Sequence, residues 1–174
     1  MSKRLYSGRV VSLDLVHVVL PNGDGIELEI VRHPGGAAVV AVDAGDRVCL
    51  LRQYRHAAGG WLWELPAGKL EPGETPLATA RRELAEEGGV AARDWSSLGD
   101  IVSSPGVFTE VVHLFLAQGL SAAAAAPEHG ECFEPVWVPR AEARERALAG
   151  DIRDAKTVVG LLRADAAWPP GRRT

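Results

Sequence analysis

The first part of the chain alternates hydrophobic and polar positions. β-Branched residues recur in short alternation from Ser7 to Leu20, and the stretch from Ile26 to Val31 alternates again. The intervening Pro21 to Gly25 has the proline, asparagine and glycine chemistry of a turn. Because a period of two is typical of half-buried strands, these segments predict a β-hairpin within an N-terminal region, residues 1–34.

Continuous apolar runs then replace this alternation. Ala37 to Val42 and Val48 to Leu51 are separated by the turn-like Asp43 to Asp46, and they predict two central strands. The alanine-rich stretch from Ser121 to Pro127 predicts a loop. Shorter strands are predicted at Trp61 to Leu65, Leu98 to Val102, Val111 to Ala117 and Pro135 to Val138.

One helix has a clear start and a clear end. Thr75 suits the N-cap and Pro76 the first helical position, whereas Gly88 and Gly89 suit the end of the helix. The apolar stripe that would dock this helix on a sheet comprises Leu77, Ala80 and Leu84.

Two more helices are predicted near the C-terminus, at Arg140 to Ala149 and Lys156 to Ala166, before a loose tail from Ala167 to Thr174. Strands, a helix, strands and then helices predict an α/β or α+β sandwich with a mixed central sheet. We assign residues 35–166 to this domain.

Three carboxylates crowd the last turns of the first helix: Glu83, Glu86 and Glu87. Side chains three and four positions apart on a helix are neighbours, so these acids repel one another. Arg82 can reach Glu86, but one arginine cannot compensate three acids. A divalent cation such as Mg²⁺, which takes oxygen ligands, would turn the repulsion into attraction.

Composition and charge restrict the class of protein. The chain has 174 residues, a length suited to one domain, and its net charge of −4 argues against a nucleic-acid binder that relies on a basic field. No apolar run approaches the ~20 residues needed to span a bilayer, and the N-terminus lacks the apolar core of a signal peptide. Cys49 and Cys132 are predicted to be free thiols in a cytoplasmic protein.

The segment from Gly68 to Val90 carries a recognisable motif. Gly68 is followed by Glu74 and then by the run Arg82 to Val90, a spacing that resembles the Nudix box in full. This resemblance implies an α/β/α sandwich that hydrolyses a nucleoside diphosphate linked to another moiety, with Mg²⁺ or Mn²⁺ as cofactor.

Four other segments look like the ADP-ribose pyrophosphatase branch of that family: Arg52 to Arg55, Trp63 to Gly68, Ser104 to Gly106 and Asp154 to Thr157. One departure concerns the loop that follows Ser104. The branch often has Ser-Pro-Gly-Phe, two polar residues and Glu, whereas this chain reads Gly-Val-Phe-Thr-Glu over residues 106–110. The spacing to Glu110 is kept, but the sugar preference is left open.

The resemblance implies a role for each acid of the motif. Glu83 and Glu87 are expected to be the direct metal ligands, and Glu86 is expected to be a third ligand or a bridge to a second ion. The backbone carbonyl of Ala67 would complete the shell. The scaffold that orients these ligands would comprise Gly68, Glu74 and Arg82.

Glu110 is the candidate general base. Cations neutralise the phosphoanhydride oxygens and lower the pKa of a bound water, and a loop carboxylate could then take the proton of that water. The alternative is that Glu83 or Glu87 doubles as the base.

Substrate contacts are expected outside the motif. Arg55 can grip phosphate through two hydrogen bonds, whereas Arg52 either joins it or pairs with a surface acid. Trp61 and Trp63 offer faces for stacking adenine, although core packing is the commoner fate of tryptophan. By resemblance, Glu64 holds the adenine amino group or the ribose, and Ser104 is a further contact. The histidines show no metal-ligand spacing and are predicted to be packing or surface residues: His17, His33, His56, His113 and His129.

These residues favour a pyrophosphatase that converts ADP-ribose, or a related ADP-sugar, to AMP and a sugar phosphate. Hydrolysis of a GDP-sugar, of coenzyme A or of an oxidised nucleotide is the alternative within the enzymes. A sensor that binds ADP-ribose without cleaving it is the alternative from another class. The resemblance also implies a homodimer, with contacts from the N-terminal hairpin and the last helices.

Overall fold

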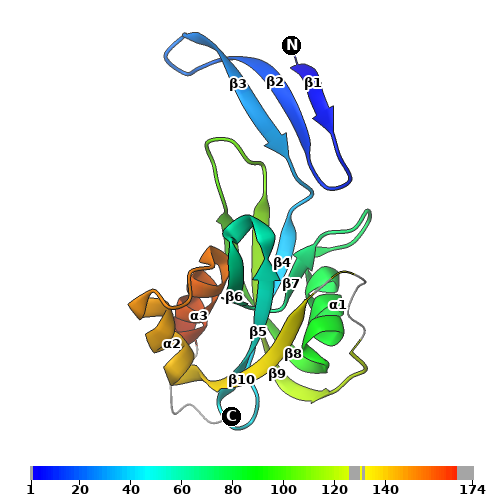
Figure 1. Cartoon of the computed structure of the whole chain (residues 1–174), viewed down its shortest axis with the longest axis vertical. Coiled ribbons are helices and arrows are strands. Elements are labelled where there is room, and N and C mark those ends of the chain that lie inside the picture. The colour runs from blue at the N-terminus through cyan, green and yellow to red at the C-terminus, as the bar shows by residue number, and fades with distance from the viewer. Residues whose placement is uncertain (1, 126–129, 131, 168–174) are drawn as a thin grey trace.

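The computed structural model of the protein describes residues 2–125, 130 and 132–167. Its N-terminal part is a three-stranded antiparallel sheet of β1 (Ser2–Ser7), β2 (Ser12–Val19) and β3 (Gly25–Arg32). β2 and β3 form the predicted hairpin, with Val16 opposite Leu28 and Val18 opposite Ile26. Figure 1 shows this sheet standing apart from the body of the molecule. β1 was not predicted, because its polar and exposed residues show no buried face.

The body contains two further sheets. Its strands are β4 (Gly36–Ala41), β5 (Arg47–Arg55), β6 (Gly60–Glu64), β7 (Ala67–Lys69), β8 (Val90–Val102), β9 (Val111–Ala122) and β10 (Phe133–Pro139). One sheet is mixed, in the order β7-β4-β9-β8, with β4 parallel to β9 and the other pairs antiparallel. The other is antiparallel, in the order β10-β5-β6, and the 3-10 turn η1 (His56–Ala58) joins β5 to β6.

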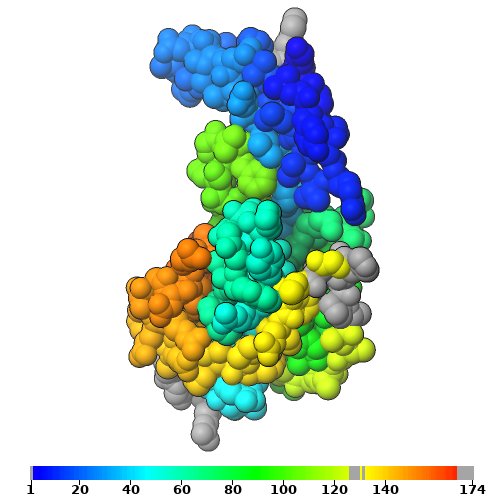
Figure 2. Space-filling view, viewed as in Figure 1, coloured from blue at the N-terminus to red at the C-terminus, as the bar shows by residue number. Residues whose placement is uncertain are grey.

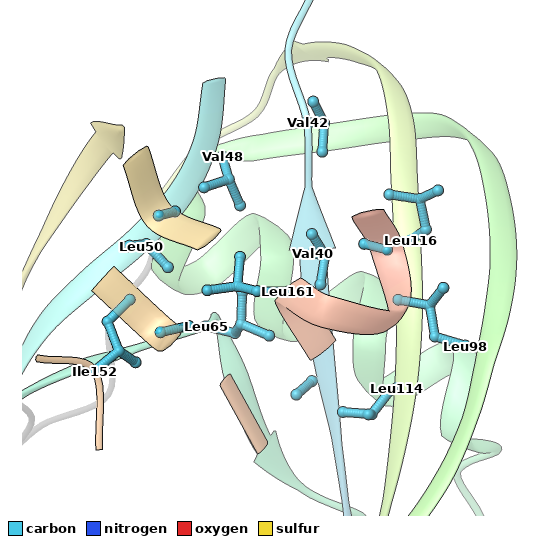
Figure 3. Close-up of a cluster of buried hydrophobic side chains, with 14 of the residues drawn as sticks. Val40, Val42, Val48, Leu50, Leu65, Leu98, Leu114, Leu116, Ile152 and Leu161 are labelled. Atoms are coloured by element: carbon cyan, nitrogen blue, oxygen red, sulfur yellow. The ribbon is translucent and has the colours of Figure 1, made fainter. Parts of the chain in front are cut away.

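Helices cover both faces of β4. The helices are α1 (Pro76–Gly88), α2 (Arg140–Ala149) and α3 (Ala155–Ala167), and Figure 1 shows α1 on one side of the sheets and the other two on the opposite side. Ala37, Val39 and Ala41 pack in one core with Ala80 and Leu84 of α1. The alternate β4 residues pack in the second core with Leu161 and Ala164 of α3, and Val40 and Leu161 are drawn together in Figure 3.

Burial on both faces explains why β4 is a continuous apolar run rather than an alternating one. A side chain at Gly160 would bring its Cβ within 2.7 Å of Leu65 and 3.3 Å of Val40, so this glycine lets α3 lie close to β4. The predicted α/β/α arrangement with a mixed sheet is therefore confirmed.

Some bounds differ from the predictions. β8 begins at Val90 and β9 ends at Ala122, so both strands are longer than predicted and Ser121 belongs to β9 rather than to a loop. The two strands pair along their whole length, apart from a register shift between Ser97 and Gly99. The predicted tail beyond residue 167, the end of the predicted loop at residues 126–127 and His129 lie outside the described residues. Among the helices that the structure describes, none is long and apolar enough to cross a membrane.

Candidate active site

α1 carries the crowded carboxylates and is firmly fixed at both ends. The Thr75 hydroxyl accepts the Ala78 N–H at 3.2 Å, and Gly89 ends the helix in the left-handed conformation with a φ of 64°. Glu83 and Glu87 are 7% and 2% exposed, whereas Glu86 is half-buried. Two of the three acids therefore lie on the buried edge of the helix, beside its apolar stripe.

Both buried acids converge on the backbone of β7. The Ala67 N–H donates a hydrogen bond of 2.7 Å to Glu87 Oε2. A Cβ on Gly68 would lie 1.7 Å from Glu83 Oε1, so only glycine leaves room for that carboxylate. A glycine at the start of a loop would ordinarily indicate a tight turn. The structure instead places it in a strand, where its missing side chain makes space for Glu83.

Arg82 connects the acids of the motif. Its Nε and Nη2 donate to the two oxygens of Glu74 at 2.9 and 3.0 Å, and its Nη1 donates to Glu83 at 2.6 Å and to Glu86 at 3.1 Å. Arg82, followed by Thr79, lowers the pKa of Glu74 to about 2, and Glu74 in turn raises the pKa of Arg82 above its ordinary value. These contacts are those that the predicted scaffold requires, and the role of the scaffold stays a prediction.

The donors of this cluster are of the chemical type that suits a hard divalent cation. One guanidinium faces several carboxylates, and carboxylate oxygens are the ligands that Mg²⁺ and Mn²⁺ prefer. Within the described part of the chain, no three Asp, Glu, His or Cys side chains are spaced as a ligand set for one ion. Arg82 Nη1 bridges Glu83 and Glu86. Binding of an ion would replace part of this contact between the arginine and the two acids.

A cavity of about 410 Å³ lies in front of this cluster. Ala67, Gly68 and Glu83 form part of its wall. Lys69 of β7 also lines it, and the charged residues that line it from outside the motif are two cations and two carboxylates: Arg55, Lys156, Glu110 and Asp154. The cavity thus combines an acidic wall, suited to a cation, with basic side chains suited to phosphate oxygens.

Glu110 reaches this cavity from the loop between β8 and β9. Its side chain is half-buried, and its Oε1 lies 3.4 Å from His33 Nδ1. The candidate base therefore faces the same space as Glu83, which its predicted role requires. Ser104 is exposed and its carbonyl accepts the N–H groups of Val107 and Phe108; Ser103, rather than Ser104, lines the cavity.

A second ionic cluster holds Glu64, which is 1% exposed. Arg55 donates to its two oxygens at 2.8 and 2.9 Å, and Lys156 Nζ lies 2.7 Å from Glu64 Oε2 and 3.1 Å from Asp154 Oδ1. Burial opposes ionisation of Glu64, but Arg55 and Lys156 outweigh it and lower its pKa. Burial likewise opposes the charge on Lys156, whereas Asp154 and Glu64 raise its pKa.

Sequence reasoning missed part of this cluster. Glu64 is not among the residues that line the cavity, and both of its oxygens are engaged with cations instead of facing a nucleoside. Lys156 and Asp154 do line the cavity, and no role was predicted for either. The signal was present, since the segment from Asp154 to Thr157 was part of the resemblance.

Arg52 and Trp61 lie elsewhere. The Arg52 guanidinium is 5.8 Å from the centroid of the Trp61 ring and 5.7 Å from that of Trp63, and Trp61 is 47% exposed. Neither Arg52 nor Trp61 lines the cavity. The structure therefore brings Arg55 to the acidic cluster but leaves Arg52 and Trp61 on a separate surface, where their substrate role stays a prediction.

Comparisons with known proteins agree with the motif. The NUDIX domain profile matches residues 32–159. The chain is 39% identical over 162 residues to the methanol dehydrogenase activator of Bacillus methanolicus, covering 92% of this chain and 88% of that protein. It is also 39% identical over 168 residues to the ADP-ribose pyrophosphatase of Mycobacterium tuberculosis, covering 95% of this chain and 81% of the relative.

The fold has a close structural counterpart. The crystal structure of an ADP compounds hydrolase superposes with a TM-score of 0.82 at 24% identity, covering 96% of this chain and 91% of the other. That likeness supports the fold, whereas the profile match over most of the chain identifies the family. The resemblance predicted from Gly68 to Val90 is confirmed: the chain belongs to the NUDIX domain family.

Proposed function

We propose that this Nudix hydrolase cleaves the pyrophosphate of ADP-ribose to AMP and a sugar phosphate. The observation that carries the proposal is the convergence of Glu83 and Glu87 on Ala67 and Gly68, at a cavity that also holds Glu110 and basic side chains. The relative named ADP-ribose pyrophosphatase supports this substrate, because the two chains align over 95% of this one.

The acids of α1 and the Ala67 carbonyl would hold the divalent cation, for which we propose Mg²⁺, with Mn²⁺ as the alternative. When bound, the ion would neutralise phosphate oxygens and lower the pKa of a coordinated water. Arg82 keeps Glu83 and Glu86 oriented, and its own contact with Glu74 fixes the guanidinium.

Arg55 and Lys156 would bind the diphosphate. Both face the cavity, and their carboxylate partners hold them in place before substrate arrives. Glu110 would accept a proton from the attacking water while the oxygen of that water bonds to phosphorus. The anhydride P–O bond then breaks, and the second phosphate departs with the bridging oxygen. Glu83 or Glu87 acting as the base is the alternative.

A substrate panel tests this function. The wild type with Mg²⁺ is expected to show its highest kcat/KM on ADP-ribose, compared with GDP-mannose, coenzyme A and an oxidised nucleoside triphosphate, and chromatography should identify AMP. Glu87→Gln, which keeps the shape of the side chain but loses its charge, is expected to be inactive. Tight binding of ADP-ribose by the wild type without any product would instead identify a sensor.

The N-terminal sheet supports a homodimer. One face of β2 and β3 carries the apolar side chains Val16, Val18, Ile26, Leu28 and Ile30. None of these side chains belongs to either buried core of the body. Light scattering should therefore give the mass of a dimer for the wild type and of a monomer for Leu28→Arg. A monomeric wild type would contradict this assembly.

The two cysteines support a cytoplasmic location. Cys49 is buried and Cys132 is exposed, and both thiols are free in the structure. Burial, followed by the charge of Glu87, raises the pKa of Cys49 to about 12, so this thiol is unreactive near neutral pH. Free thiols are typical of a reducing compartment.

A further inference from the structure

The segment that joins the N-terminal sheet to the body lies against the loop that carries Glu110. Val31 is at the end of β3, and its N–H donates to the Val107 carbonyl at 2.7 Å. The Thr109 N–H returns a hydrogen bond of 3.0 Å to the Val31 carbonyl. Figure 2 shows the green surface of this loop directly beneath the blue N-terminal sheet. Two segments far apart in the sequence are therefore paired next to the cavity.

His33, the second residue after Val31, lies next to the candidate base. Its backbone N–H donates to Thr109 Oγ1 at 3.0 Å, and its ring lies 5.2 Å from the Phe108 ring, tilted by 53°. Its Nδ1 accepts the Gly35 N–H at 3.1 Å and also lies 3.4 Å from Glu110 Oε1. The His33 side chain is 12% exposed and that of Glu110 is 22% exposed.

These contacts with Thr109, Gly35 and Phe108 fix the imidazole independently of the Glu110 carboxylate. While Nδ1 accepts the Gly35 N–H, a neutral ring has no proton there to give to Glu110. The ring then borders the carboxylate instead of binding it, and it blocks the side of Glu110 that faces the linking segment. The space that remains for Glu110 is the cavity that both residues line.

We propose that His33 is a positioning residue that holds Glu110 toward the cavity, and that Thr109 fixes His33 for this task. The inference rests on the proposed role of Glu110 as the general base. It gives the linking segment a function in catalysis, whereas the sequence alone predicted a packing or surface residue at His33.

His33→Phe tests the fixing of the ring, because it removes the Nδ1 that accepts the Gly35 N–H. Phenylalanine keeps the aromatic contact with Phe108 and the backbone N–H to Thr109 but lacks Nδ1. We expect kcat for ADP-ribose to fall about tenfold, less than the ~100-fold that a displacement of ~1 Å can cause. KM and the Mg²⁺ concentration for half-maximal rate should stay within about twofold of the wild type, because the variant leaves the metal ligands in place.

A double-mutant cycle separates this proposal from the proposed function. Glu110→Gln should abolish most turnover, and adding His33→Phe should cause no further loss, because the two residues act as one unit. A further tenfold loss in the double variant would overturn the role of His33. So would an unchanged kcat in His33→Phe when Glu110→Gln is inactive. Wild-type turnover by Glu110→Gln would refute Glu110 as the base and with it the role of His33, whereas the proposed cleavage of ADP-ribose would stand with Glu83 or Glu87 as the base.

Thr109 supplies a matched pair of variants. Thr109→Val keeps the shape but removes the hydroxyl that accepts the His33 N–H, whereas Thr109→Ser retains it. We expect a severalfold loss of kcat in the valine variant and near wild-type kcat in the serine variant, with unfolding temperatures that match. Equal losses in both would show that the hydrogen bond is not the cause and would overturn the role of Thr109.

Discussion

Two ionic clusters border one cavity, and they differ in charge balance. The α1 cluster joins one cation to three carboxylates and comprises Arg82, Glu74, Glu83 and Glu86. The β6 cluster joins two cations to two carboxylates and comprises Arg55, Lys156, Glu64 and Asp154.

This difference in charge balance indicates different functions for the two clusters. In the β6 cluster each charge has its partner, so the cluster is complete without a ligand and holds its cations in position. The α1 cluster has more carboxylates than cations at a buried edge, and a bound divalent cation would neutralise this excess. The difference predicts that loss of a carboxylate from the α1 cluster impairs metal binding without lowering stability, whereas loss of a carboxylate from the β6 cluster lowers stability and leaves metal binding intact.

Glu83→Gln should have the largest effect. We expect kcat to fall by more than about 100-fold, above the ~10–100-fold range for residues that only support metal ligands. The unfolding temperature of the metal-free protein should not fall, since one charge is removed from a crowded set. Steady-state hydrolysis and thermal unfolding measure both, with the exposed Glu29→Gln as the control for loss of a charge. If Glu83→Gln lost stability but kept its activity, the function that we assign to the α1 cluster would be wrong.

Magnesium binding should produce the next largest effect. At a concentration 100 times the Kd, Mg²⁺ should stabilise the folded wild type by about 2.7 kcal/mol, which raises the Tm by several degrees. Glu83→Gln should show little of this shift. Differential scanning fluorimetry with a titration of MgCl₂, against a matched titration of NaCl, provides the measurement. An identical shift in wild type and variant would place the ion outside the α1 cluster.

Glu64→Gln should give the opposite pattern to Glu83→Gln. It leaves Arg55 and Lys156 with half of their carboxylate charge, so we expect a loss of about 1–2 kcal/mol in unfolding free energy. This is less than the ~3–5 kcal/mol for a fully buried pair, because the Arg55 side chain is 42% exposed. Urea unfolding measures the loss, and the Mg²⁺-dependent shift in Tm should be retained. A stable variant without that shift would reverse our assignment of the clusters.

Acid should weaken the α1 cluster through Glu74, with the smallest effect. The pKa of Glu74 is lowered from 4.5 to about 2, so its ionised form contributes stability that is complete above pH 4.5. That contribution is lost as the pH falls from 4.5 toward 2. The stability difference between wild type and Glu74→Gln should therefore shrink between pH 6 and pH 3 in urea unfolding. A difference that stays constant over that range would contradict the contact with Arg82.

The parts of the fold that local pattern encodes were predictable. α1 begins at Pro76 and ends at Gly88 because capping residues mark both ends. β7 was missed because its three residues are too few to alternate, and its strand character comes from pairing with β4. β8 was predicted only from Leu98 to Val102, since its first part is only partly buried and obtains its hydrogen bonds from β9.

The candidate site likewise contains contacts that follow from local sequence and contacts that depend on tertiary packing. The acids of the motif lie within one helix, so their proximity follows from their spacing. The contact between Lys156 and Glu64 joins residues 92 positions apart, and it depends on how α3 packs against β6. The approach of His33 to Glu110 likewise depends on two loops meeting, which no local pattern specifies.

Gly68 shows what kind of constraint acts on the first position of the motif. Its φ is not in the left-handed region, so conformational freedom is not the reason for glycine there. The requirement is volume: even one methyl group would overlap the Glu83 carboxylate. An alanine at this position would fit only if the Glu83 carboxylate moved away from the backbone of β7, so the glycine keeps open the place that this carboxylate occupies.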